Sequence, residues 1–196
     1  MSGQGKQAKI LSDRQVRRVL DEVKHRRYPA RDRVIVLLSI RAGLRAKEIA
    51  SATWGMVLDA DGEVSDALQL PNKASKGRNG GRTIPLHPEL RDALVVLKAT
   101  RNVDADDRII FSERTIGMDA NAVVVWFHRL YAELGLKGAS SHSGRRTFVT
   151  NLAKRAVEAG GSLRDVQQLA GHASLQTTQR YIEGDSEAKC RMINLL

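Results

Sequence analysis

A histidine and an arginine three residues apart at the start of a helix can together bind a phosphate, and His142 and Arg145 form such a pair. At this spacing the imidazole and the guanidinium share one helix face. The N-terminus of the helix adds free backbone N–H groups and the positive end of the helix dipole. Arg146 follows directly and lies about 100° around the helix, on another face. Because the pair is common by chance, it indicates a phosphate site only together with other groups.

Further cations stand in two other segments. Arg45 follows the residues AGL at an expected helix start, and its guanidinium can bind two phosphate oxygens at once, unlike a lysine. Glu48 is either its orienting partner or an ordinary helix charge. The segment NKASKGRNGGR carries more cations on an expected turn: Lys73, Lys76, Arg78 and Arg82. Its glycines lack the spacing of a nucleotide-binding loop, so this basic hairpin is either solvated or reaches into a DNA groove.

His172 and Tyr181 lie nine residues apart, with a glycine turn just before the histidine. A phenol has an ordinary pKa near 10, so it attacks at neutral pH only with help. Nearby cations favour the phenolate, and a histidine can accept its proton. Tyr181 is therefore either a packing residue or a nucleophile directed at a phosphate.

The elements expected around these residues are mainly helices. Ser12 is the predicted N-cap of the first helix, and the run VIVLLSI suits a buried helix that ends with Gly43 as its C′ residue. Further helices are predicted over residues 87–101, 119–135, 141–161 and 162–171, and from Ser174 through Tyr181.

A segment of different character separates these helices. Asp61-Gly62 and Asn79-Gly80 are turn signals, and ALQL between them alternates apolar and polar residues. This pattern predicts three short antiparallel strands near 56–59, 66–71 and 82–86. We therefore expect an α+β fold that is mainly α-helical, with a small three-stranded antiparallel sheet.

The composition fits a nucleic-acid partner. The 196 residues are enough for one domain with its own core, and the net charge of +10 favours a polyanion. The single cysteine, Cys190, excludes an internal disulfide and a thiolate metal cluster, and indicates a reduced thiol. No signal peptide or membrane-spanning run stands out. These features predict a cytoplasmic protein.

Five short motifs stand in order along the chain: AGLRAKEI, NKASKG with RTIPLHPEL, SHSGRRTF, LAGH and TTQRYI. In this order they resemble the tyrosine recombinase (phage integrase) family, whose signature is Arg, Lys, His-x-x-Arg, His and Tyr. The resemblance covers roughly residues 10 to 184. It implies a flexible tail over 1–11, a catalytic domain over 12–184, and a tail over 185–196 that either docks on a neighbouring subunit or folds back on its own domain.

The resemblance also implies the roles of the reacting and charge-stabilising groups. Tyr181 would attack the scissile phosphate and form a 3′-phosphotyrosine link to DNA. Arg45 and Arg145 would bind the non-bridging oxygens and stabilise the transition state. With these cations supplying positive charge, the chemistry requires no metal, and the phosphotyrosine conserves the bond energy without ATP.

The proton transfers fall to three further groups under the same resemblance. His142 would act as general base toward the tyrosine, and His172 would donate to the phosphate. Lys73 would protonate the departing 5′-oxygen, because the family lysine lies at the end of the middle strand; Lys76 is the alternative.

The resemblance implies a site-specific DNA recombinase that acts on double-stranded DNA, assembled as a cyclic oligomer. The expected DNA contacts outside the catalytic set are Lys76, Arg78, Arg82 and Arg146. Two other functions remain as alternatives: DNA relaxation like that of type IB topoisomerases, and a non-catalytic DNA-binding remnant. Whether the reaction integrates, excises, inverts or resolves DNA is left open.

The chain departs from the family pattern in two respects. Ser143-Gly144 stands where an acidic residue and a leucine are more usual, and Gly144 is expected to loosen the helix start by about 1 kcal/mol. The usual N-terminal core-binding domain is also missing from the sequence. The chain is then either a fragment of a longer protein or a naturally short member, like the fimbrial phase-variation invertases.

Overall fold

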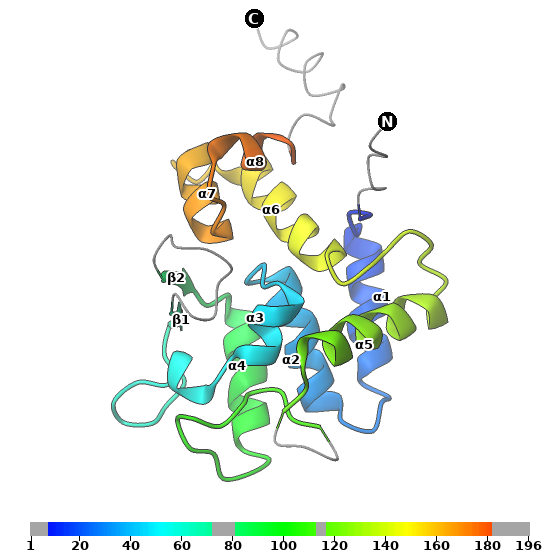
Figure 1. Cartoon of the computed structure of the whole chain (residues 1–196), viewed down its shortest axis with the longest axis vertical. Coiled ribbons are helices and arrows are strands. Elements are labelled where there is room, and N and C mark those ends of the chain that lie inside the picture. Colours follow the sequence, from blue (N-terminus) through cyan, green and yellow to red (C-terminus); the bar gives the residue numbers. More distant parts are fainter. Residues whose placement is uncertain (1–7, 72–80, 113–116, 182–196) are drawn as a thin grey trace, which may run out of the picture. The chain divides into compact units, whose positions relative to one another are not determined.

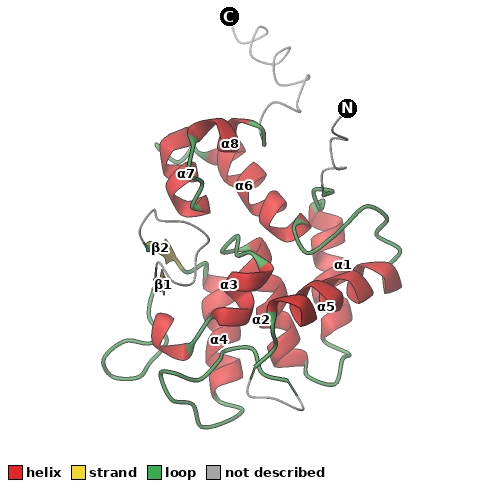
Figure 2. Ribbon diagram, viewed as in Figure 1, coloured by secondary structure: helices red, strands yellow, loops and turns green. Residues whose placement is uncertain are grey.

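The computed structural model describes residues 8–71, 81–112 and 117–181, and over these residues helices dominate (Figure 2). The chain divides into two compact units, Met1–Phe148 and Val149–Leu196. The boundary falls inside one helix, α6 (Ser143–Arg155). The expected α+β fold with a predominance of helix is confirmed. No helix in the described part of the chain is long and apolar enough to cross a membrane.

The first unit is built around helix α2, which contacts three of its neighbours. Before α6, the described residues of this unit form the helices α1 (Asp13–Val23), α2 (Pro29–Ile40), α3 (Ala46–Ser51), α4 (Pro88–Lys98) and α5 (Ala120–Glu133), which are labelled in Figure 1. They also form a 3₁₀ turn, η1 (Trp54–Met56). Helix α2 packs on α1, α3 and α4, and α3 packs on α5. The run Val34–Ile40 is buried on every side of α2. The aliphatic side chains of this run therefore form the centre of the core.

The helix starts follow the sequence signals. Ser12 caps α1, with its hydroxyl accepting from the Gln15 N–H while the Gln15 side chain accepts from the Ser12 N–H. Pro88 is the first residue of α4, a position where its missing N–H costs no helical hydrogen bond.

The end of α2 differs from the prediction. The helix ends at Ile40 with Arg41 as its C-cap, so Gly43 lies one residue beyond the C′ position. Gly43 has φ +64°, and the following Leu44 N–H returns to the Leu38 carbonyl at 3.0 Å. The left-handed residue thus closes a wider turn than the sequence predicted, and this turn leads directly into α3.

The predicted three-stranded sheet is wrong in one strand. Strands β1 (Ala67–Leu70) and β2 (Arg82–Pro85) pair antiparallel, with Leu70 opposite Arg82. Over the described residues these two make the only sheet. The stretch 56–59 instead follows η1 and makes a single bridge between Leu58 and Val64.

The reason for this difference is the turn that begins at Asp59. Its carboxylate accepts hydrogen bonds from the Asp61 and Glu63 N–H groups at 3.0 and 2.8 Å. These bonds bend the chain immediately after the bridge, because an Asp side chain competes for backbone donors in this way. The pairing therefore stops at one bridge and does not extend to a strand.

Helix α6 begins in close contact with α2. A Cβ placed on Gly144 would lie 2.3 Å from the Ser39 hydroxyl oxygen and 3.0 Å from the Ile40 Cγ2. Such distances are too short for any side chain beyond hydrogen. Glycine at this position therefore allows the close approach of two helices, in addition to any loosening of the helix start.

The second unit contains the rest of α6, α7 (Leu163–Ala170) and α8 (Leu175–Gln179). Helices α7 and α8 pack on each other. Ser162 and Asp165 form a capping box on α7, and Gly171 ends it with φ +61°. Ser174 caps α8 as predicted. The helix ends at Gln179, however, so Tyr181 follows it and does not lie within it.

The contact at Gly144 gives a test of helix packing. We expect Gly144→Ala to lower the free energy of unfolding by about 1–3 kcal/mol, because the new methyl group overpacks against Ser39. Gly135→Ala is the control, since Gly135 has φ +64° but nothing within 4 Å, and we expect a loss of about 1 kcal/mol from backbone strain alone. Chemical denaturation measures both. A stabilised Gly144→Ala variant would contradict the close packing.

Candidate active site

Arg45 lies at the N-terminus of α3, where it is the N-cap residue. The turn at Gly43 delivers the chain to this position, and Leu44 between them is fully buried. Burial of Leu44 and Ile49 fixes the orientation of the short helix. The Arg45 side chain is 30% exposed. It therefore combines a fixed backbone with a guanidinium that solvent, or a ligand, can reach.

Arg145 is held on the same turn from a distant part of the sequence. Its guanidinium donates to the Gly43 carbonyl at 2.6 Å, and the residue is only 4% exposed. The Phe148 ring, one helical turn later, packs where a Cβ of Gly43 would lie, at 2.3 Å. Both contacts depend on a glycine at position 43. The turn that precedes Arg45 is thus also the one that binds the Arg145 guanidinium, from a motif about 100 residues away.

Glu48 decides how Arg45 is oriented. Its side chain is 1% exposed, and its Oε2 accepts from the Arg45 backbone N–H at 2.8 Å. Its Oε1 accepts from the Arg45 guanidinium at 3.0 Å. Of the two alternatives that the sequence left open, the structure shows the orienting partner. Arg82 also donates to both carboxylate oxygens, at 3.0 and 3.1 Å.

The arginines keep this buried carboxylate ionised. Burial alone would raise the pKa of Glu48, but the hydrogen bonds and charge of Arg82, together with those of Arg45, outweigh burial and lower it. A buried carboxylate without such partners would be strongly destabilising. Glu48 therefore carries a negative charge between two positive ones at neutral pH.

His142 lies immediately before α6 and is exposed. Its carbonyl accepts from the Arg146 N–H at 2.9 Å, and its own N–H donates to the Ser140 hydroxyl at 3.3 Å. The predicted pair thus stands at a helix N-terminus, with Arg145 buried on the Gly43 turn and His142 open to solvent. The imidazole is accessible for proton exchange in this position.

His172 and Tyr181 meet within the second unit. Their rings stack with centroids 5.3 Å apart and an interplanar angle of 20°. The His172 Nδ1 lies 2.9 Å from the buried Thr178 hydroxyl, and the Gln167 side chain donates to the His172 carbonyl at 3.0 Å. The nine-residue step seen in the sequence therefore gives direct contact between the two rings, with the histidine held on two sides.

The remaining predicted residues have different surroundings. Lys73, Lys76 and Arg78 lie outside the described residues. Arg82 is 10% exposed and bonded to Glu48, and Arg146 donates to the Ala8 carbonyl at 2.9 Å. Arg82 and Arg146, both expected to contact DNA, thus have partners inside the protein.

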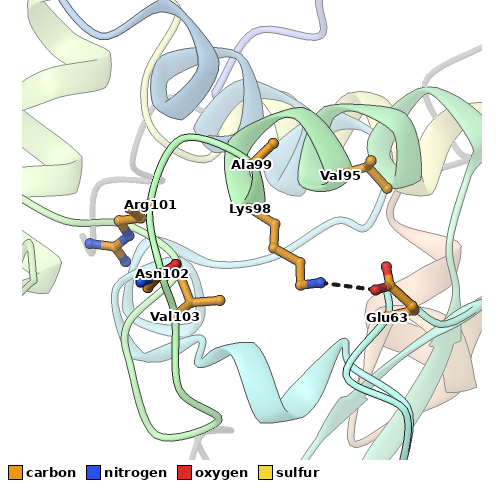
Figure 3. Close-up of a pocket in the computed structure, with 7 residues that line it drawn as sticks. All are labelled: Glu63, Val95, Lys98, Ala99, Arg101, Asn102 and Val103. Carbon is orange, nitrogen blue, oxygen red and sulfur yellow. Dashed lines mark hydrogen bonds and ion pairs between the residues drawn. The ribbon is translucent and has the colours of Figure 1, made fainter.

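A surface hollow beside the end of α4 is lined by Glu63, Val95, Lys98, Ala99, Arg101, Asn102 and Val103 (Figure 3). An ion pair of 3.3 Å joins Lys98 to Glu63 across it. The residues that the sequence singled out lie elsewhere in the chain. In the described ranges no group of three or more His, Cys, Asp or Glu side chains is placed to hold a metal ion.

Comparison with known proteins establishes the family. The sequence model of the phage integrase family matches residues 9–187, almost the whole chain. The chain belongs to the phage integrase family.

Relatives and solved structures agree with this assignment. The chain is 30% identical over 161 residues to tyrosine recombinase XerC of Brucella melitensis, which covers 81% of this chain and 48% of XerC. It is 28% identical to tyrosine recombinase XerA of Thermococcus onnurineus, over 88% of this chain and 57% of XerA. The chain thus spans about half the length of the curated relatives it matches.

The fold is shared with solved structures of this class. The Tn1549 transposon integrase in complex with a circular intermediate DNA aligns with a TM-score of 0.75 at 18% identity, covering 100% of this chain and 68% of that one. A crystal structure of XerA recombinase aligns with a TM-score of 0.71 at 23% identity, covering 95% and 64%.

Two site features were not singled out from the sequence. The Arg82 contact with Glu48 joins residues 34 positions apart, and only the fold reveals it. Thr178 had no signal beyond its place on the last helix. The spacing of Arg45 and Glu48, by contrast, resembles a capping box and already contained the information needed to pair them.

The charge on Glu48 gives a prediction about stability and pH. Glu48→Gln should lower the free energy of unfolding by about 3 kcal/mol at pH 7, because two arginines lose a buried partner. The folded-state pKa lies below the ordinary 4.5, so the stabilisation is fully present above pH 4.5 and is lost as the pH falls through the folded value. Denaturation as a function of pH should therefore show the two proteins converging in acid.

The matched control is Glu63→Gln, which removes an exposed carboxylate paired with Lys98. We expect a change of less than about 1 kcal/mol at pH 7. Equal losses in the two variants would show that Glu48 is not stabilised by its arginines.

The contact between His172 and Thr178 gives a second prediction. A neutral His172 can donate from Nε2 only if Thr178 donates its hydroxyl proton to Nδ1. We expect ¹⁵N NMR of the imidazole to show the proton on Nε2 in the wild type, with a shift toward the Nδ1–H tautomer in Thr178→Val. A wild-type ring protonated on Nδ1 would contradict this arrangement. Thr177→Val, one residue away and less buried, is the control.

Proposed function

We propose that the chain is the catalytic domain, over residues 12–184, of a site-specific DNA recombinase that cuts and rejoins strands through Tyr181. The observation that carries the proposal is the Gly43 turn, whose carbonyl accepts from the Arg145 guanidinium and which leads directly to Arg45 at the start of α3. The partly exposed guanidinium of Arg45 suits the non-bridging oxygens of a phosphodiester. Membership of the phage integrase family supports the same chemistry.

The reaction is a transesterification. The Tyr181 phenolic oxygen attacks the scissile phosphorus, a bond forms between them, and the bond to the 5′-oxygen breaks. The product is a 3′-phosphotyrosine and a free 5′-hydroxyl. Attack by another 5′-hydroxyl reverses the step and rejoins the strand, so no external energy source enters the balance.

The family resemblance supports the following proton transfers. His142, exposed before α6, takes the phenolic proton. His172 donates to the phosphate and holds the tyrosine ring by stacking. Lys73, or Lys76 in its place, gives a proton to the departing 5′-oxygen. Arg45 and Arg145 stabilise the charge that accumulates on the phosphorane.

The proposed partner is double-stranded DNA. A net charge of +10 favours it, and the similar solved structures include DNA complexes of the Tn1549 integrase and of XerH recombinase bound to its difH substrate. Lys76, Arg78 and Arg146 are proposed as backbone contacts. We further propose assembly into a cyclic oligomer on DNA, with residues 185–196 docking on the neighbouring subunit, in the cytoplasm.

A covalent adduct tests the proposed nucleophile. Duplexes that the wild-type chain binds are first selected from a pool with random sequence. They are then nicked so that the short fragment that carries the free 5′-hydroxyl leaves after cleavage. We expect a protein–DNA adduct on denaturing gels that disappears in Tyr181→Phe, because only the phenolic oxygen can attack. Tyr28→Phe, which alters a half-buried tyrosine in the first unit, should keep the adduct.

The other outcomes separate the alternatives. An adduct that survives in Tyr181→Phe would exclude this nucleophile. Binding without any adduct would favour a non-catalytic DNA-binding protein. Relaxation of supercoiled plasmid lacking a selected site would favour activity like that of the type IB topoisomerases.

A further inference from the structure

Arg82 binds Glu48 more completely than Arg45 does. Two of its guanidinium nitrogens reach the two carboxylate oxygens, Nη1 to Oε1 at 3.0 Å and Nη2 to Oε2 at 3.1 Å. This is the paired geometry in which a guanidinium binds a carboxylate most strongly. Arg45 uses one nitrogen of its guanidinium, Nη1, on Oε1, and its backbone N–H on Oε2. The carboxylate is thus shared between two arginines from β2 and α3.

The exposures of the two arginines differ. The Arg82 side chain is 10% exposed, against 30% for Arg45. Both Nη nitrogens of Arg82 already bind the Glu48 carboxylate, so this guanidinium is poorly placed to bind a DNA phosphate as well. Among the described residues, the Arg45 guanidinium makes its hydrogen bond to Glu48 through Nη1 alone, and the side chain is partly exposed. Direct contact with a ligand therefore falls to Arg45.

We propose that Arg82 is a positioning residue, which acts through Glu48 to keep Arg45 oriented and available for the scissile phosphate. The charges give the reason. Two guanidiniums around one carboxylate leave the group with a net charge of one positive unit. Without Arg82, Glu48 would be free to take both forks of Arg45, and the pair would be neutral. This inference rests on the proposed function of Arg45 as a phosphate ligand.

Arg82 also connects the β1–β2 strand pair to α3, through its ion pair with Glu48. It is the first residue of β2 and pairs with Leu70, the last residue of β1. Both strands flank the segment 72–80, which holds Lys73 in the sequence. One buried ion pair therefore connects β2 to the helix that follows Arg45. Loss of Arg82 should impair the catalytic step more than DNA binding.

The test compares Arg82→Lys with Arg91→Gln. Lysine keeps the charge at position 82 but cannot span both oxygens. Arg91 pairs with Asp66 at 3.3 Å just before β1, but the pair is exposed, so its loss controls for removing an arginine ion pair beside the same hairpin. For each protein, the Kd for a selected duplex and the single-turnover rate of adduct formation at saturating protein are measured.

We expect Arg82→Lys to slow adduct formation roughly 10- to 100-fold, with the Kd within about twofold of wild type and Arg91→Gln unchanged in both. A methylphosphonate at the mapped scissile position lacks the negative charge that Arg45 would bind. A defect that acts through Arg45 should therefore shrink on this substrate, whereas general loss of structure would not. An unchanged rate, or a weakened Kd with a normal rate, overturns the inference and in the second case makes Arg82 a DNA contact.

A measurement without DNA keeps the two proposals distinguishable. The side-chain N–H signals of Arg45 are followed by ¹⁵N NMR in the free protein. We expect faster exchange with water in Arg82→Lys than in wild type or Arg91→Gln, because Arg45 is no longer held. Unchanged Arg45 signals overturn the positioning role. If the wild type forms no adduct, the proposed function fails, and this signal still decides whether Arg82 orients Arg45.

Discussion

The hydrogen bond from the Arg145 guanidinium to the Gly43 carbonyl is the contact on which the arginine site depends. It requires a turn whose carbonyl faces α6, and only the left-handed conformation of Gly43 gives that turn. The same glycine leaves the space that Phe148 fills. The main chain that accepts this bond continues through Leu44 to Arg45. The position of one arginine therefore sets the position of the other.

The second feature that positions Arg45 is the buried carboxylate of Glu48. A carboxylate as buried as Glu48 is tolerated only with full hydrogen bonding and opposite charge around it. Arg45 and Arg82 satisfy both of its oxygens, and the lowered pKa of Glu48 expresses the same balance. Burial of a carboxylate usually lowers stability, but here the buried Glu48 carboxylate orients the Arg45 guanidinium. The site thus obtains rigidity from a short helix that would be marginal alone.

Much of this could be predicted from the sequence because the signals are local. Ser12 and Ser174 mark helix starts through hydrogen bonds within their own turns, and both starts were predicted correctly. The family motifs selected the candidate arginines, histidines and tyrosine by residue type and order. The three-residue spacing of Arg45 and Glu48 offered the orienting contact as one of two alternatives, and the structure shows that contact.

The remainder depends on contacts that sequence does not express. The strand expected at 56–59 failed because the Asp59 carboxylate takes backbone donors that a strand would need. The Arg82 contact with Glu48 needs the register of β2 against β1, which no local pattern specifies. Gly144 was expected to weaken a helix. The packing shows that its missing side chain also lets α6 approach Ser39 and Ile40 of α2.

The contact of Gly144 with Ser39 has a consequence for exchanging segments between this chain and its relatives. Positions 39 and 144 are separated by more than 100 residues, yet the Ser39 side chain lies where a side chain at position 144 would have to lie. The size of the residue at one position therefore limits the size at the other. If α6 were replaced by that of a relative with a larger residue at position 144, this residue would clash with the unchanged α2. The smallest unit that can be exchanged intact at this point is therefore the pair of helices, α2 with α6.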